Sequence, residues 1–133
     1  MNIYLDIDGV LLVNESNAAS HADELLQYVI NKYPESTYWL TTHCWNGENR
    51  TIKVLAPHLK PETIKLLGKV KPTEWKELKT DAIDLSSPFI WLDDDLWPDE
   101  EEVLQSSNTI DNFIMVDLSK NPDQLKDIID SRI

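Results

Sequence analysis

The segment Asn2-Ile3-Tyr4-Leu5-Asp6-Ile7-Asp8-Gly9-Val10 decides the fold expected for this chain. Its apolar beginning, bounded by polar residues and a glycine, is typical of a short strand buried on both faces. Asp6 and Asp8 stand two positions apart, so an extended backbone points both side chains to one face. Two desolvated carboxylates need a cation or a shared proton, and Gly9 allows a sharp turn or a close ligand approach. The segment therefore predicts a metal-assisted active site at the end of a first strand.

Two other interpretations of this segment stay open at this point. A solvated turn that carries two surface acids needs no cation. An EF-hand calcium loop fits less well, because it has its glycine at the sixth position and a Glu at the twelfth. Counted from Asp6, Gly9 is fourth and Asn17 is twelfth.

Composition limits the classes of protein to consider. A length of 133 residues favours one domain spanning residues 1–133, and 41% hydrophobic with 27% charged residues is typical of a globular protein. The net charge of −12 disfavours nucleic acid as a partner, although a local basic patch is not excluded. Cys44 has no internal disulfide partner, which fits a reducing compartment. We find no signal peptide and no apolar run near the ~18 residues of a membrane span, so we expect a cytoplasmic location and no membrane partner.

The rest of the chain alternates between predicted strands and helices. Further strands are predicted at Thr37–Thr41, within Ile64–Leu67, at Phe89–Leu92 and at Asn112–Leu118. Helices are predicted from Ser20 to Tyr33, from Asn49 to Ala56, from Pro72 through Ala82, from Pro98, and from Pro122 behind an Asn121 N-cap. Residues Leu11 to Ala19 are predicted to form a loop. This alternation predicts an α/β, Rossmann-like, doubly wound and mainly parallel sheet with helices on both faces.

Polar side chains follow three of the predicted strands. Asp6 and Asp8 end the first strand, Thr41 ends the second, and Asp93 with Asp94 follows Phe89–Leu92. Open parallel sheets bind ligands outside the carboxyl ends of their strands, so we expect these side chains to gather in one crevice.

These motifs, in this order and over nearly the whole chain, resemble those of the haloacid dehalogenase (HAD)-like hydrolases. The resemblance implies a magnesium-dependent phosphatase in which Asp6 attacks phosphorus and forms an aspartyl-phosphate. It further implies that Asp8 is the general acid and base, and that Thr41 hydrogen-bonds the phosphoryl group. Asp6, the backbone carbonyl of Asp8, Asp93 and Asp94 would then hold Mg²⁺ through hard oxygen ligands.

The family also uses a lysine that precedes the last acidic motif. Lys71, Lys76 and Lys79 are the candidates in this chain. We favour Lys79, because Lys79-Thr80-Asp81-Ala82-Ile83 most resembles the corresponding stretch of small HAD-like proteins, and Lys76 is second.

Many HAD-like enzymes carry a cap domain over the active site. Only 32 residues separate Asp8 from Thr41 and 37 separate Thr41 from Lys79, and a loop, a helix and a short strand account for them. We therefore expect no cap. Capless members tend to act on large substrates or to cover the site with an oligomer partner. The phosphorylated substrate could therefore be a small molecule or a macromolecule, and the protein could be a monomer or an oligomer.

Other functions compatible with this pattern stay open. The same fold could perform phosphoryl transfer or C–X bond cleavage, although the double acid Asp93-Asp94 speaks against metal-free dehalogenation. An inactive HAD-like binding or regulatory module is a further alternative. A receiver-like signalling domain would have its acidic pair on the first strand and its phosphorylated Asp on the third, unlike this chain. A thiol–histidine site at His43 and Cys44 is disfavoured, since neighbours on an extended segment face opposite ways.

Overall fold

The computed structural model describes every residue from Met1 to Ile133. Its centre is a four-stranded sheet in the spatial order β4-β1-β5-β6, and all of its neighbouring strands run parallel. The strands are β1 (Asn2–Leu5), β4 (Thr37–Trp39), β5 (Phe89–Asp93) and β6 (Phe113–Met115). The predicted α/β architecture with a parallel sheet is confirmed, and it is compatible with a Rossmann-like fold.

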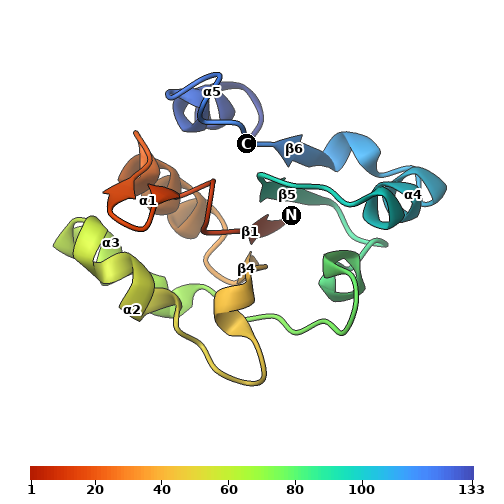
Figure 1. Cartoon of the computed structure of the whole chain (residues 1–133), viewed down its shortest axis with the longest axis horizontal. Helices are drawn as coiled ribbons and strands as arrows, with labels where there is room; N and C mark the ends of the chain where they lie inside the picture. The colour runs from red at the N-terminus through yellow and green to blue at the C-terminus, as the bar shows by residue number, and fades with distance from the viewer.

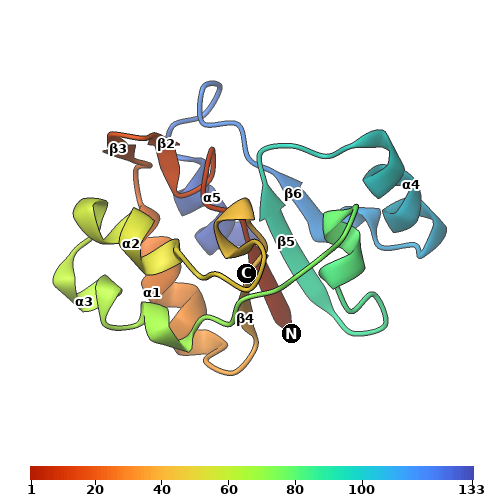
Figure 2. The same cartoon turned by 60° about the horizontal axis from the view of Figure 1, so that its bottom comes forward.

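Helices cover both faces of this sheet (Figures 1 and 2). The packing follows the alternation of side chains along the strands, since Ile3 and Leu5 of β1 face one core and Tyr4 faces the other. The larger core receives α1 (Ala22–Lys32) and α5 (Gln124–Ser131), and the smaller core receives α4 (Pro98–Ser106) and the 3₁₀ helix η4 (Lys79–Ala82). None of these helices has the length and apolar surface that a bilayer crossing requires.

Shorter elements fill the connections. The predicted loop at Leu11–Ala19 contains a small antiparallel hairpin of β2 (Leu12–Asn14) and β3 (Asn17–Ala18). The predicted helix at Asn49–Ala56 is present as α2 (Thr51–Leu55). Four more 3₁₀ turns and one short helix complete the chain: η1 (Thr42–Cys44), η2 (Ala56–His58), α3 (Pro61–Ile64), η3 (Leu67–Lys69) and η5 (Ile110–Asn112).

The strand predicted within Ile64–Leu67 is wrong. Pro61 begins α3, and Thr63 turns its hydroxyl inward to the carboxylate of Asp23 instead of joining a sheet. The sheet edge lies further along, where Lys71 donates its N–H to the Thr37 carbonyl at 3.0 Å. That contact is an isolated bridge rather than a fifth strand.

The helix predicted from Pro72 through Ala82 is also wrong, because only its last turn, η4, is helical. The Thr73 hydroxyl donates to the Trp39 carbonyl at 2.6 Å, which ties this segment to the end of β4. Trp75 packs on the Trp45 ring instead of on a helix neighbour. Tertiary contacts therefore override the helical spacing of the apolar residues.

Two helix starts also differ from the prediction by two residues. The helix predicted from Ser20 begins at Ala22, after His21 adopts a left-handed φ of 67°. The helix predicted from Pro122 begins at Gln124. Asn121 does not cap it but accepts the Asp123 N–H in a turn before the helix.

His21 joins the beginnings of α1 and α5. Its Nδ1 lies 3.0 Å from Glu24 Oε1, and its Nε2 lies 3.1 Å from Asp123 Oδ1. The hydrogen bond to Glu24, aided by Asp123 and opposed by burial, raises the pKa of His21 above its ordinary value. The folded protein therefore binds the imidazole proton more tightly than the unfolded chain does.

We expect His21→Asn, which tolerates the left-handed backbone, to destabilise the protein more at about pH 5.5 than at about pH 8.5. The contribution of a raised pKa is fully present below the unfolded value of about 6.5 and disappears as the pH rises through the folded value. Urea denaturation of both proteins at the two pH values measures this. His58→Asn is the control, since His58 makes no ion pair, and an equal loss at both pH values would contradict the prediction.

Candidate active site

The two central strands place two acids side by side. Asp93 is the last residue of β5, and Asp6 follows β1, where its N–H donates to the Leu92 carbonyl at 3.1 Å. Both acids continue the side-chain alternation that points Tyr4 and Trp91 toward η4 and α4. Asp6 is 7% exposed and Asp93 is 1% exposed. The fold therefore brings two carboxylates out of water at the carboxyl ends of the two central strands.

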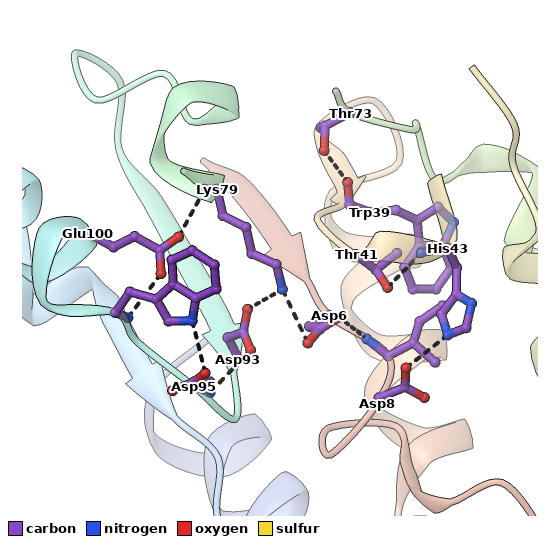
Figure 3. Close-up of polar contacts among 12 residues, drawn as sticks. Asp6, Asp8, Trp39, Thr41, His43, Thr73, Lys79, Asp93, Asp95 and Glu100 are labelled. Atoms are coloured by element: carbon purple, nitrogen blue, oxygen red, sulfur yellow. Dashed lines mark hydrogen bonds and ion pairs between the residues drawn. The ribbon is translucent and has the colours of Figure 1, made fainter. Parts of the chain in front are cut away.

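Lys79 lies between these carboxylates (Figure 3). Its Nζ is 2.7 Å from Asp93 Oδ2 and 3.3 Å from Asp6 Oδ2. Glu100 of α4 holds the lysine in place, because its Oε2 accepts the Lys79 N–H at 2.9 Å while its Oε1 accepts the Trp97 N–H at 3.0 Å. Of the three candidate lysines, Lys79 is thus the one that contacts the acids.

The other two candidate lysines lie elsewhere. Lys71 directs its Nζ to the carbonyl of Glu35, 2.7 Å away. Lys76 is exposed and lines the cavity beside the acids without an ion pair to them.

Burial and mutual charge shift the pKa values of Asp93 and Lys79. Burial and the charge of Asp6 raise the pKa of Asp93 to about 8, although Lys79 acts against this rise. Burial lowers the pKa of Lys79, but the charges of Asp6 and Asp93 outweigh that effect and leave it raised. Burial and the Asp6 charge therefore disfavour the charged form of Asp93 more strongly than Lys79 favours it.

A third acid completes the cluster. Single carboxylate oxygens of Asp6, Asp93 and Asp94 all lie within 4.8 Å of one another, and Asp94 is exposed. Gly9 makes room for Asp94, because a Cβ on Gly9 would lie 2.7 Å from the Asp94 Cβ and still nearer to its carboxylate. Gly9 also has a φ of +78°, which a residue with a side chain adopts only with strain.

The remaining predicted site residues lie on the other side of Asp6 (Figure 3). The Asp8 side chain is 66% exposed, and its Oδ2 lies 3.0 Å from His43 Nε2. The Asp8 carboxylate is thus not part of the three-acid cluster. Thr41 is fully buried, and its hydroxyl accepts the His43 N–H at 3.4 Å, whereas the neighbouring Thr42 lines the cavity.

A cavity of about 680 Å³ opens beside the cluster. Asp6, Lys79, Asp93 and Asp94 are among its lining residues, so a ligand in it reaches the ion-paired acids. The other lining residues are Thr42, Trp45, Trp75, Lys76, Glu77, Asp95, Trp97 and Glu100. A ligand with one anionic end could place that end against Lys79 and a bound cation.

Sequence reasoning missed two residues that position the site. It left His43 without an acid partner, since Asp8 lies 35 positions away in the chain. It also did not assign Glu100 to Lys79. The position of Glu100 three residues after Trp97 was a local signal, because a Glu there can reach back to the backbone at a helix start.

Comparison of the chain with protein-family models, with curated proteins and with solved structures gives no match. The resemblance to the HAD-like hydrolases therefore rests on the sequence motifs alone.

The role of Gly9 can be tested by stability. Gly47 has a φ of +77°, and the nearest atom to a Cβ there is Glu74 Oε1 at 3.9 Å. Gly47→Ala should therefore cost only the left-handed strain, ~1–2 kcal/mol. Gly9→Ala should cost ~1–3 kcal/mol more, because its methyl group also collides with Asp94.

Urea denaturation of both variants, alone and combined with Asp94→Gly, measures the two costs separately. Removing the whole Asp94 side chain, whose Cβ alone would lie 2.7 Å from a Cβ on Gly9, should abolish most of the extra cost at Gly9 and leave the cost at Gly47 as it was. Equal costs at both glycines in every background would show that Asp94 does not constrain Gly9.

Proposed function

We propose that this protein is a HAD-like phosphatase that hydrolyses phosphoric monoesters through an aspartyl-phosphate on Asp6. One observation carries the proposal: Lys79 bridges Asp6 and Asp93 at the carboxyl ends of the two central parallel strands. A carboxylate becomes an effective nucleophile toward phosphate only where positive charge offsets the repulsion between the two anions. Lys79 supplies such charge within contact distance of Asp6.

The donor set of the cluster fits Mg²⁺. The ion prefers oxygen ligands, and Asp6, Asp93 and Asp94 bring three carboxylates together with the single ammonium of Lys79. Asp6, Asp93, Asp94 and the backbone carbonyl of Asp8 would hold it. When bound, Mg²⁺ would neutralise charge on the phosphoryl oxygens and so favour the attack of one anion on another.

In the first step, an Asp6 oxygen attacks phosphorus while the bond from phosphorus to the ester oxygen breaks. The Ile7 N–H donates to Asp6 Oδ1 at 2.8 Å, which orients the carboxylate. The leaving oxygen takes a proton from Asp8. Lys79 stabilises the negative charge that builds up on the phosphoryl group.

In the second step, water attacks the phosphorus of the aspartyl-phosphate and gives a proton to Asp8. The bond between phosphorus and Asp6 breaks, which releases inorganic phosphate and restores the Asp6 carboxylate. The contact between His43 and Asp8 fixes the orientation of the Asp8 carboxylate for both proton transfers. Thr41 is assigned to the phosphoryl group by resemblance, and its neighbour Thr42 is the one that lines the cavity.

The proposal includes the absence of a cap. The chain between Asp8 and Thr41 forms the hairpin β2–β3 and α1, and the chain between Thr41 and Lys79 forms short helices and turns. The exposed Asp8 side chain and the open cavity leave room for water or for an acceptor alcohol. An acceptor alcohol in place of water would make the protein a phosphotransferase.

The assignment of Asp6 and Asp8 is tested with para-nitrophenyl phosphate, whose leaving group needs no proton. With Mg²⁺, Asp6→Asn should have no turnover, because an amide does not form the acyl phosphate. Asp8→Asn should form the aspartyl-phosphate and hydrolyse it ~10²–10⁴-fold more slowly than the wild type. Intact-protein mass spectrometry after acid quenching detects the intermediate.

The control for this test is the same set of assays with Mg²⁺ removed by a chelator, which should abolish turnover in the wild type. Substantial phosphatase activity in Asp6→Asn would refute the covalent mechanism. A wild type that hydrolyses no phosphomonoester would refute the phosphatase proposal itself.

Lys79 and Lys76 form a matched pair for a second test, since both line the cavity and only Lys79 contacts the acids. Lys79→Met should lower kcat/KM by ~10²–10³-fold, the usual loss for a contact aimed at the transition state. Lys76→Met should change it only slightly. Lys79→Arg keeps the charge and separates lost catalysis from lost folding, which circular dichroism monitors.

If Lys76→Met were the more damaging variant, the charge-neutralising role would belong to Lys76. Equally mild losses in both variants would remove both lysines from the reacting centre.

A further inference from the structure

Three tryptophans stand around the cavity of the candidate site, and each comes from a different segment. Trp45 follows η1, Trp75 lies between Lys71 and η4, and Trp97 immediately precedes α4. Trp45 is 42% exposed and Trp97 is 56% exposed, whereas Trp39 and Trp91 are fully buried in the cores. Exposed tryptophans that converge on one cavity are typical of a binding surface rather than of core packing.

These rings are fixed before any ligand arrives. Trp45 and Trp75 pack edge to face, with ring centroids 5.2 Å apart and planes at 70°. The Trp97 indole donates its Nε1–H to Asp95 Oδ2 at 3.2 Å, and its backbone N–H is held by Glu100. Fixed rings lose little conformational entropy on binding, so stacking on them is efficient.

The Trp45–Trp75 pair does not fill its surroundings. A second hollow of about 690 Å³, lined by both rings and by residues of the loop after η1, lies against the same pair. Because both rings line two cavities, a ligand can pack against them. Packing between these two rings alone therefore does not account for them.

The tryptophans Trp45, Trp75 and Trp97 line the same cavity as Lys79 and the acids. The Lys79 Nζ, which contacts Asp6, lies 5.9 Å from the centroid of the Trp75 ring. A ligand whose phosphate meets Lys79 would thus extend along the tryptophans.

The charges of the lining narrow the chemistry of the ligand. Six acids and two lysines line the cavity: Asp6, Glu77, Asp93, Asp94, Asp95, Glu100, Lys76 and Lys79. This balance disfavours a chain of phosphates beyond the one that meets Lys79. Lys79 already lies over Trp75, so the protein's own ammonium takes the place that a quaternary ammonium ligand would need there.

Resting on the phosphatase function proposed above, we infer that the substrate is a monophosphate ester whose alcohol carries a flat aromatic ring, such as a nucleobase, that stacks on these tryptophans. Indole rings stack on any base because each base has a π-face. Trp45 and Trp97 are thus specificity residues, and the acids and Lys79 act on the phosphate alone.

The test compares adenosine 5′-monophosphate with ribose 5-phosphate, because both are phosphate esters of the primary hydroxyl of ribose and only the first carries a base. The wild type should prefer the nucleotide in kcat/KM by on the order of 10- to 100-fold, the range expected for base stacking. Trp45→Ala should bring this preference toward one, and Trp45→Phe should keep most of it. Ile52→Ala is the control, since Ile52 is also 42% exposed and lies outside the cavity lining, and it should keep the full preference.

A binding measurement separates this inference from catalysis. In NMR spectra, adenosine should shift the indole N–H signals of Trp45, Trp75 and Trp97, while the buried Trp39 and Trp91 serve as internal controls. Free ribose should shift none of the five.

Adenosine-induced shifts in a protein that hydrolyses no phosphomonoester, para-nitrophenyl phosphate included, would support the aromatic site and refute the phosphatase. Equal hydrolysis of both esters with unmoved indole signals would overturn the aromatic site and leave the phosphatase standing.

Discussion

The ion pairs of Lys79 with Asp6 and Asp93 join the two central strands to η4, and the rest of the site is arranged around them. Two buried carboxylates at neighbouring strand ends repel each other, and their desolvation costs several kcal/mol per ion if it is not offset. A buried pair of this kind is weak evidence for stability but strong evidence for a constraint, because loss of one partner leaves the others unpaired. Glu100 adds to the constraint by fixing the lysine backbone.

Backbone geometry and electrostatics act on the same few atoms. The left-handed φ at Gly9 turns the chain just after Asp8, and the absence of a Cβ there lets Asp94 approach. Asp94 in turn is the acid that brings the cluster to three carboxylates. The glycine of the opening motif is therefore a requirement of the acid cluster and not only of a turn.

The strands and site residues that depend on short local sequence patterns were predictable. A buried apolar run at Phe89–Leu92 bounded by Pro88 and acids predicted β5, and the rule for parallel sheets then predicted that Asp6 and Asp93 share one crevice. The segment after Pro72 was not predictable in this way. Thr73 hydrogen-bonds to a residue, and Trp75 packs on a ring, that lie more than twenty positions away in the chain. The contact of His43 with Asp8 likewise depends on the path of the chain between them, which the residues next to His43 or next to Asp8 do not encode.

The opening motif contains two acids of one type in two different surroundings. Asp6 is buried and paired with an ammonium, so its charge is held at one place and its oxygens have fixed directions. Asp8 is exposed to solvent and hydrogen-bonded to an imidazole, so water can reach its carboxylate. Surroundings rather than residue type divide the roles of two neighbouring carboxyl groups. In the proposed reaction, Asp6, which an ammonium and a backbone N–H hold in place, is the attacking group, and Asp8, which water can reach, is the proton carrier.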